Sequence, residues 1–192
     1  MMKALLIGHS YVKDLFRLNI NKIELLDHTS VDLHFKFISG AKYRNFLDNL
    51  AWLTEAKNIN PDIIVAIIGG NDIVNSVSTT ELNNSCRDFF KFLRFQFPST
   101  RIIAAQVELR FYLSNNRFGC PVQAEYDLRR KSLNTFLKRL KSKDCILQVQ
   151  GHGRLDDRNL YRDEVHLNTV GLYRYFGFVK HTIQYCFNKH FA

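Results

Sequence analysis

The chain has 192 residues, of which 46% are hydrophobic and 13% aromatic. This composition excludes a disordered chain and allows a domain with its own core. Only 9 Gly and 3 Pro exclude collagen-like and low-complexity classes. The 27 Lys and Arg residues outnumber the 18 Asp and Glu residues, and the resulting formal charge of +9 favours an anionic partner without identifying it.

Strands and helices are expected to alternate along the chain. Short apolar or alternating runs predict strands at Lys3–Ile7, Val31–Ser39, Asp62–Ile68, Arg101–Leu109 and Cys145–Val149. Helical spacing of apolar residues predicts helices at Tyr11 to about Ile20, Tyr43–Lys57, Thr80 to about Phe97, Val122–Lys143, and Asn168 to about Asn188, the last capped by Asn168 or Thr169. This order indicates one domain over residues 1–192, an α/β protein of three α/β/α layers around a five-stranded parallel sheet.

The cysteine spacing and the lengths of the apolar runs indicate the cellular compartment in which the protein is expected. Cys86, Cys120, Cys145 and Cys186 are too widely spaced for a CxxC zinc site or a small disulfide scaffold. The longest apolar run, residues 63–68, is far too short for a membrane span, and the apolar start is too short for a signal peptide. We therefore expect a cytoplasmic or nuclear protein with reduced, mostly buried thiols.

Several polar residues and glycines follow the predicted strands, at the sheet edge where ligands bind in such folds. Ser10 follows the first strand, Gly40 the second and Asn71 the third, and Asp163 and His166 follow the fifth. Each has an ordinary alternative: a helix cap, a turn glycine, an Asx-turn and a weak surface ion pair, respectively. Together, however, they supply a nucleophile, an acid–base pair and oxyanion donors at one edge.

In this order the residues resemble the sequence blocks of the SGNH (GDSL-type) hydrolases. Ile7-Gly8-His9-Ser10 is similar to the first block, Gly40 to the second, Gly69-Gly70-Asn71-Asp72 to the third, and Asp163-Glu164-Val165-His166 to the last. The resemblance implies a flavodoxin-like topology and a serine esterase that hydrolyses a carboxylic ester with a short acyl or lipid part, with no cofactor and no metal. Some non-LTR retrotransposons carry esterase domains of this family in a nucleic-acid-binding protein, and the basic charge fits that setting.

The resemblance also implies a role for each residue, and acyl-transfer chemistry requires the same roles. Ser10 is the nucleophile, His166 the base that activates it, and Asp163 the acid that orients His166. The oxyanion hole comes from the backbone N–H groups of Ser10 and Gly40 and from the side-chain amide of Asn71. The family usually has Asp before the nucleophile, where this chain has His9. We therefore expect different local hydrogen bonds at that turn.

Two further features concern substrates and partners. Loop aromatics at the same edge are candidate walls for an apolar acyl group: Tyr11, Phe111, Tyr112 and Phe118. Packing of these rings against the domain explains them equally well. The helix predicted at Val122–Lys143 is basic, with an expected buried stripe of Leu128, Leu133, Phe136, Leu137 and Leu140. Its charges form either a solvated face or a surface for an anionic lipid or nucleic acid, carried by Arg129, Arg130, Lys131, Lys138 and Arg139.

Two alternatives to an esterase remain. The chain could be a catalytically silent binding module with the SGNH fold, since His9 departs from the family pattern. It could also be an accessory domain that associates with nucleic acid or a membrane through the basic helix.

Overall fold

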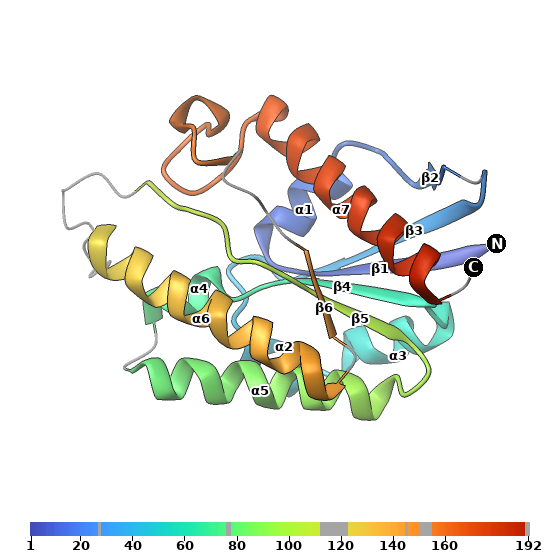
Figure 1. Ribbon diagram of the computed structural model, residues 1–192, viewed down its shortest axis with the longest axis horizontal. Coiled ribbons are helices and arrows are strands. Elements are labelled where there is room, and N and C mark those ends of the chain that lie inside the picture. Colours follow the sequence, from blue (N-terminus) through green and yellow to red (C-terminus); the bar gives the residue numbers. More distant parts are fainter. Residues whose placement is uncertain (27, 76–77, 112–122, 145, 150–154, 191–192) are drawn as a thin grey trace.

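The computed structural model describes residues 1–26, 28–75, 78–111, 123–144, 146–149 and 155–190. Its centre is a six-stranded sheet in the order β2-β3-β1-β4-β5-β6 (Figure 1). The strands are β1 (Met2–Gly8), β2 (Lys22–Glu24), β3 (Ser30–Phe37), β4 (Ile63–Ile67), β5 (Arg101–Ala105) and β6 (Ile146–Val149). All neighbouring pairs are parallel except β2 and β3, which are antiparallel.

The five predicted parallel strands are confirmed, in the order expected of a flavodoxin-like sheet. The sequence analysis missed β2, which pairs Ile23 with Val31 at the edge of the sheet. A three-residue strand is too short to show alternation, and among the described strands it pairs with β3 alone. The sheet is therefore mixed at this edge and parallel elsewhere.

Helices cover both faces of the sheet, so the predicted three-layer architecture is confirmed (Figure 1). On one face lie α1 (Ser10–Phe16) and α7 (Thr169–His190). On the other lie α2 (Tyr43–Asp48), α3 (Ala51–Ile59), α4 (Gly70–Asn75), α5 (Thr79–Gln96) and α6 (Gln123–Asp144). Asn168 caps α7, since its side-chain oxygen accepts from the N–H of Gly171 at 3.0 Å.

Each face of the sheet has its own apolar core. Successive residues of a strand point to opposite faces, so Leu6 of β1 packs with α1 and α7 while Leu5 packs with the helices of the other face. Cys186 lies buried in the first core and Cys86 in the second, both as free thiols. Cys120 and Cys145 lie outside the described residues.

Two helix predictions were wrong in detail. The helix expected over Tyr43–Lys57 is two helices, because Asn49 takes an extended conformation and its side chain accepts from the N–H of Ala51 at 3.1 Å. In α6, Leu128 is 69% exposed instead of buried. Leu133 and Leu137 of the predicted stripe are buried as expected, together with Tyr126 and Asn134.

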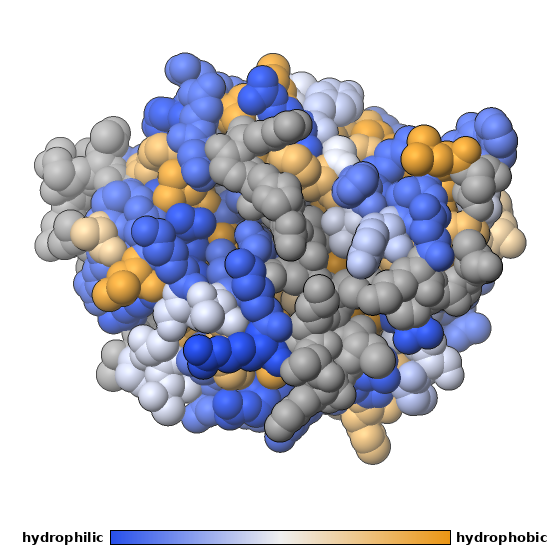
Figure 2. All heavy atoms as spheres, viewed as in Figure 1, coloured by the Kyte–Doolittle hydropathy of each residue, from blue (hydrophilic) through white to orange (hydrophobic). Residues whose placement is uncertain are grey.

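On the face shown in Figure 2, hydrophilic residues predominate and hydrophobic ones form separate small patches. Within the described residues, no helix combines the length and the apolar character needed to cross a bilayer.

Candidate active site

Ser10 is the first residue of α1, directly after the end of β1. The two strands that frame this turn approach closely, since a Cβ at Gly8 would lie 2.0 Å from the carbonyl oxygen of Ile67. Ser10 is not the helix cap. The cap is His9, whose Nδ1 accepts from the N–H of Tyr11 at 3.4 Å. His9 thus supplies the side-chain acceptor at the position where the resembled family usually has Asp.

His9 is buried and neutral. Burial, with smaller contributions from Arg110 and His166, lowers the pKa of His9 to about 3. With Nδ1 facing the backbone of α1, His9 is a structural cap for the turn.

Asp163, His166 and Ser10 form a chain of two hydrogen bonds. Nδ1 of His166 lies 2.9 Å from Oδ2 of Asp163, and Nε2 of His166 lies 3.1 Å from Oγ of Ser10. The structure therefore brings these three residues together, although Ser10 and His166 lie 156 positions apart in the chain. The distances are those expected for a base positioned to take the serine proton.

The segment that carries Asp163 and His166 is a loop closed by a bridge between Tyr161 and Leu167. Oδ1 of Asp163 accepts from the N–H groups of Val165 and His166 at 2.7 and 2.6 Å. Partial burial of Asp163 acts to raise its pKa, but these hydrogen bonds and the contact with His166 outweigh it and lower the pKa. Asp163 is thereby held as a carboxylate.

Two contacts tie this loop to α1, the helix that begins at Ser10. The hydroxyl of Tyr11 donates to the carbonyl of Val165 at 2.7 Å. Arg162, next to Asp163, donates to Oδ2 of Asp14 at 3.0 Å, and the Asp14 side chain is only 3% exposed. Since Tyr11 and Asp14 lie in the same short helix as Ser10, both contacts hold the loop in place relative to the nucleophile.

The three predicted oxyanion donors lie in segments that are bonded to one another. The N–H of Ile38 donates to the carbonyl of Gly8 at 3.0 Å, which joins the end of β3 to the turn before Ser10. Gly40 follows with a positive φ of 72°, a conformation that favours glycine. Asn71, in the first turn of α4, donates from Nδ2 to the carbonyl of Ala41 at 3.1 Å. The side chain of Asn71 therefore lies beside the Gly40 turn.

Sequence reasoning did not single out Arg110, which is 5% exposed and donates from Nη2 to Oδ1 of Asn71 at 3.1 Å. It also did not find the roles of Asp14 and Arg162 described above. Asp72, beside Asn71, accepts from the N–H of Tyr43 at 3.1 and 3.3 Å, and burial raises its pKa to about 7. These contacts join residues far apart in the chain, so no local pattern could have indicated them.

The aromatic residues predicted to line the substrate site are packed within the domain where the structure describes them. Tyr11 is only 4% exposed, because its ring is packed against Tyr175 and its hydroxyl holds Val165. It is a tether and not an open wall. Phe111 packs edge-on against Tyr161 at 5.0 Å, as its structural alternative predicted. Tyr112 and Phe118 lie outside the described residues.

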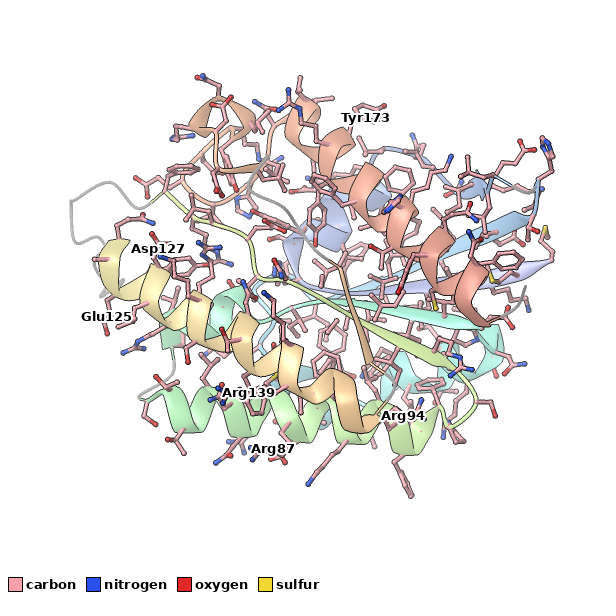
Figure 3. The ribbon with its side chains drawn as sticks, viewed as in Figure 1. Arg87, Arg94, Glu125, Asp127, Arg139 and Tyr173 are labelled. Carbon is pink, nitrogen blue, oxygen red and sulfur yellow. The ribbon has the colours of Figure 1, made fainter. Side chains whose placement is uncertain are left out.

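Arg129 and Arg130, which were predicted to form part of an anion-binding face of α6, are paired within the molecule. Arg129 lies 2.6 Å from Glu125 and also donates to the carbonyl of Ile73 in α4, and Arg130 lies 3.4 Å from Asp127. Lys131, Lys138 and Arg139 are exposed. Figure 3 shows Glu125 and Asp127 toward the start of α6 and Arg139 toward its end. Binding of an anionic surface by this helix stays a prediction.

The described residues hold no cluster of three or more His, Cys, Asp or Glu side chains arranged for a metal ion. No family model and no curated protein sequence matches the chain. Solved structures do match over nearly its whole length.

A lipase/acylhydrolase from Enterococcus faecalis matches with a TM-score of 0.69 and 16% identity, over 96% of each chain. A GDSL-like lipase from Bacteroides thetaiotaomicron matches with a TM-score of 0.66 and 16% identity, over 97% of this chain and 88% of the lipase. A catalytic mutant of an acetylxylan esterase from Geobacillus stearothermophilus matches with a TM-score of 0.63 and 17% identity, over 93% and 92%. At these identities the likeness concerns the fold, and the chain has the three-layer fold of the SGNH (GDSL-type) hydrolases.

Proposed function

We propose that this protein is a serine esterase that hydrolyses a carboxylic ester through an acyl-enzyme on Ser10. The observation that carries the proposal is the chain of two hydrogen bonds from Asp163 through His166 to Ser10, at 2.9 and 3.1 Å. If Ser10 were only a helix cap, or Asp163 and His166 only a surface ion pair, at most one of these two hydrogen bonds would be expected. A serine nucleophile needs both, because its hydroxyl is unreactive without a base and the base needs a defined tautomer.

Acylation begins when Nε2 of His166 takes the proton of Ser10 and Oγ attacks the ester carbonyl carbon. Negative charge then develops on the carbonyl oxygen, where the N–H groups of Ser10 and Gly40 and the amide of Asn71 stabilise it. The tetrahedral intermediate collapses, the bond to the alcohol oxygen breaks, and His166 returns its proton to that oxygen. Asp163 stays ionised and stabilises the imidazolium that exists between the two proton transfers.

Deacylation repeats these steps with water. His166 takes a proton from a water molecule, the resulting hydroxide attacks the acyl carbon, and the acid leaves as Ser10 recovers its proton. Every group that moves a proton in this scheme belongs to the Asp163–His166 loop or to the start of α1.

Partial exposure of the site leaves room for a substrate to reach Ser10. The side chains of His166 and Asp163 are 30% and 50% exposed, so an acyl group can reach Ser10 from solution. Similar structures include a lipase/acylhydrolase and an acetylxylan esterase, whose names cover both lipid and acetyl esters. We propose the same two classes for this chain.

The test is hydrolysis of p-nitrophenyl esters of increasing acyl length by the wild type, Ser10→Ala and His166→Ala. We expect measurable turnover by the wild type and a loss of about 10⁶-fold in kcat in either variant. Ser85→Ala, which removes a serine of α5 far from the site in the chain, is the matched control and should turn over like the wild type.

Labelling by a fluorophosphonate gives a second readout. One label on the wild type and on Ser85→Ala, with none on Ser10→Ala, supports Ser10 as the nucleophile. A folded wild type that neither hydrolyses any ester of the series nor takes up the label contradicts the proposal and favours the silent binding module.

A further inference from the structure

The guanidinium of Arg110 is buried directly beside the predicted oxyanion donor. The residue is 5% exposed and donates from Nη2 to Oδ1 of Asn71 at 3.1 Å. On its other side the guanidinium carbon lies 5.8 Å from the centre of the Tyr126 ring, within the range of a cation–π contact. Arg110 also lines a small cavity under the Ser10 turn, together with His9, Tyr11 and Gly70.

The turn before Asn71 has the shape that this guanidinium needs. A Cβ at Gly70 would lie 2.5 Å from Nη2 and 3.0 Å from the guanidinium carbon of Arg110. Any larger residue at position 70 would have to push the guanidinium away. The glycine of this turn thus leaves the space through which Arg110 reaches Asn71.

The contact determines which way the Asn71 amide points. Arginine only donates hydrogen bonds, so the Asn71 atom that faces Arg110 must be the acceptor Oδ1. Nδ2 is then on the opposite side, where one of its two hydrogens bonds the carbonyl of Ala41 at 3.1 Å. The second hydrogen of Nδ2 is the one that an oxyanion can receive.

The contact also strengthens that second hydrogen as a donor. A cation on Oδ1 pulls electron density from the amide nitrogen, and hydrogen bonds in such a chain reinforce one another. The buried guanidinium of Arg110 lies behind Asn71, the residue predicted to bind the oxyanion. Its positive charge stabilises the developing negative charge further, since screening by water is weak in a buried site.

We propose that Arg110 is a positioning residue of the oxyanion hole, which orients and polarises the amide of Asn71 without touching substrate. This inference rests on the proposed esterase activity. Arg110 is proposed to act on catalysis through the side chain of Asn71 alone. Replacing Arg110 should therefore have no further effect on kcat once the Asn71 amide has been removed.

The test is a double-mutant cycle of ester hydrolysis with the wild type, Arg110→Met, Asn71→Ala and the double variant. Arg110→Met should lower kcat about tenfold with little change in KM, less than the loss of about 10²–10³ expected of Asn71→Ala. In the Asn71→Ala background, Arg110→Met should change kcat by less than about twofold, because the amide that it acts on is gone.

Gly70→Ala provides a second route that leaves the guanidinium in the chain but displaces it from Asn71. It should lower kcat like Arg110→Met, and it takes the place of that variant in the cycle if Arg110→Met does not fold. Gly177→Ala, where an added Cβ meets nothing within 4 Å, is the matched control and should leave kcat unchanged.

The outcomes separate this inference from the proposed function. If the wild type is active and Ser10→Ala inactive, but Arg110→Met costs the same factor in both backgrounds or raises only KM, the role of Arg110 is wrong and the esterase stands. If the wild type is inert and Ser10 takes no label, the esterase proposal fails, and the oxyanion role of Arg110 fails with it.

Discussion

The loop that carries Asp163 and His166 lies at the surface, whereas the turn that carries Asn71 is held under a buried guanidinium. Asp163 is half exposed, and the loop depends on two contacts with α1, one from Tyr11 and one from Arg162. Asn71, in the first turn of α4, is hydrogen-bonded to the side chain of Arg110, which is 5% exposed. The predicted proton-transfer groups are thus reachable from solution, whereas the half-buried Asn71 is held by a buried cation.

This difference has a chemical reason. Proton transfer needs access for substrate and water, and a few hydrogen bonds suffice to aim an imidazole. Stabilising a developing charge works best with dipoles that are already oriented and poorly screened, which requires burial. Substitutions in the Asp163–His166 loop and in the Asn71 turn should therefore lower kcat for different reasons.

The largest expected effect in this comparison is at Asp163 in the exposed loop. Asp163→Asn retains an oxygen that can accept from Val165 and His166, so the loop should keep its shape. Its new NH₂ group would face Nδ1 of His166 and leave the proton on Nε2, where it cannot accept the proton of Ser10. We expect a loss of about 10⁴ in kcat with a Tm near that of the wild type.

Steady-state kinetics with a p-nitrophenyl ester and a thermal unfolding curve measure both quantities. A kcat within tenfold of the wild type would show that Asp163 does not orient the base. A large drop in Tm would show that it mainly holds the loop together.

A smaller effect is expected where the loop is tied to α1. Arg162 and Arg17 both pair with the buried carboxylate of Asp14, at 3.0 and 3.1 Å, but only Arg162 belongs to the loop. Arg162→Met should let the loop shift and lower kcat about tenfold, because small displacements of a base are costly. Arg17→Met removes a cation from the same carboxylate and should stay within about twofold of the wild type.

Comparing kcat of these two variants under identical conditions distinguishes the position of the loop from the charge balance around Asp14. Equal losses would mean that the charge balance of Asp14 matters and that the tether does not. A loss confined to Arg162→Met would support a loop that is held in place from α1.

Much of this arrangement could be predicted from the sequence, because the patterns are local. The apolar run that forms β4 and the alternation in β3 gave strands close to those observed. Ser10, Asn71, Asp163 and His166 stand in short blocks at strand ends, and parallel strands bring their carboxyl ends to one edge. The structure brings Ser10, Asp163 and His166 into contact, while their catalytic roles stay predictions.

The remaining features depend on contacts between distant parts of the chain. Arg110 meets Asn71 across 39 positions, and Arg162 meets Asp14 across 148. Neither pair has a spacing that a pattern could reveal. Leu128 was assigned to a buried stripe by helical spacing, but the position of α6 on the domain decides which of its faces is covered.

The last expected effect is on stability rather than on kcat and concerns His9, which lies buried between the two sides of the site. An unfolded chain protonates histidine below about pH 6.5, whereas burial lowers the pKa of His9 to about 3 in the folded state. Between about pH 6 and 4 the unfolded state therefore binds the extra proton. The contribution of His9 to the free energy of unfolding should fall as pH falls, by up to about 1.4 kcal/mol per pH unit.

His9→Asn isolates this contribution, because Asn also caps helices but does not titrate. Urea unfolding of both proteins over this range should show the wild type losing stability relative to the variant as pH falls. His9→Gln should give the same pH dependence with a different offset, since only capping differs. A difference that stays flat with pH would mean that folded His9 binds a proton as readily as the unfolded chain does. That result would contradict the burial of a neutral His9 near the guanidinium of Arg110.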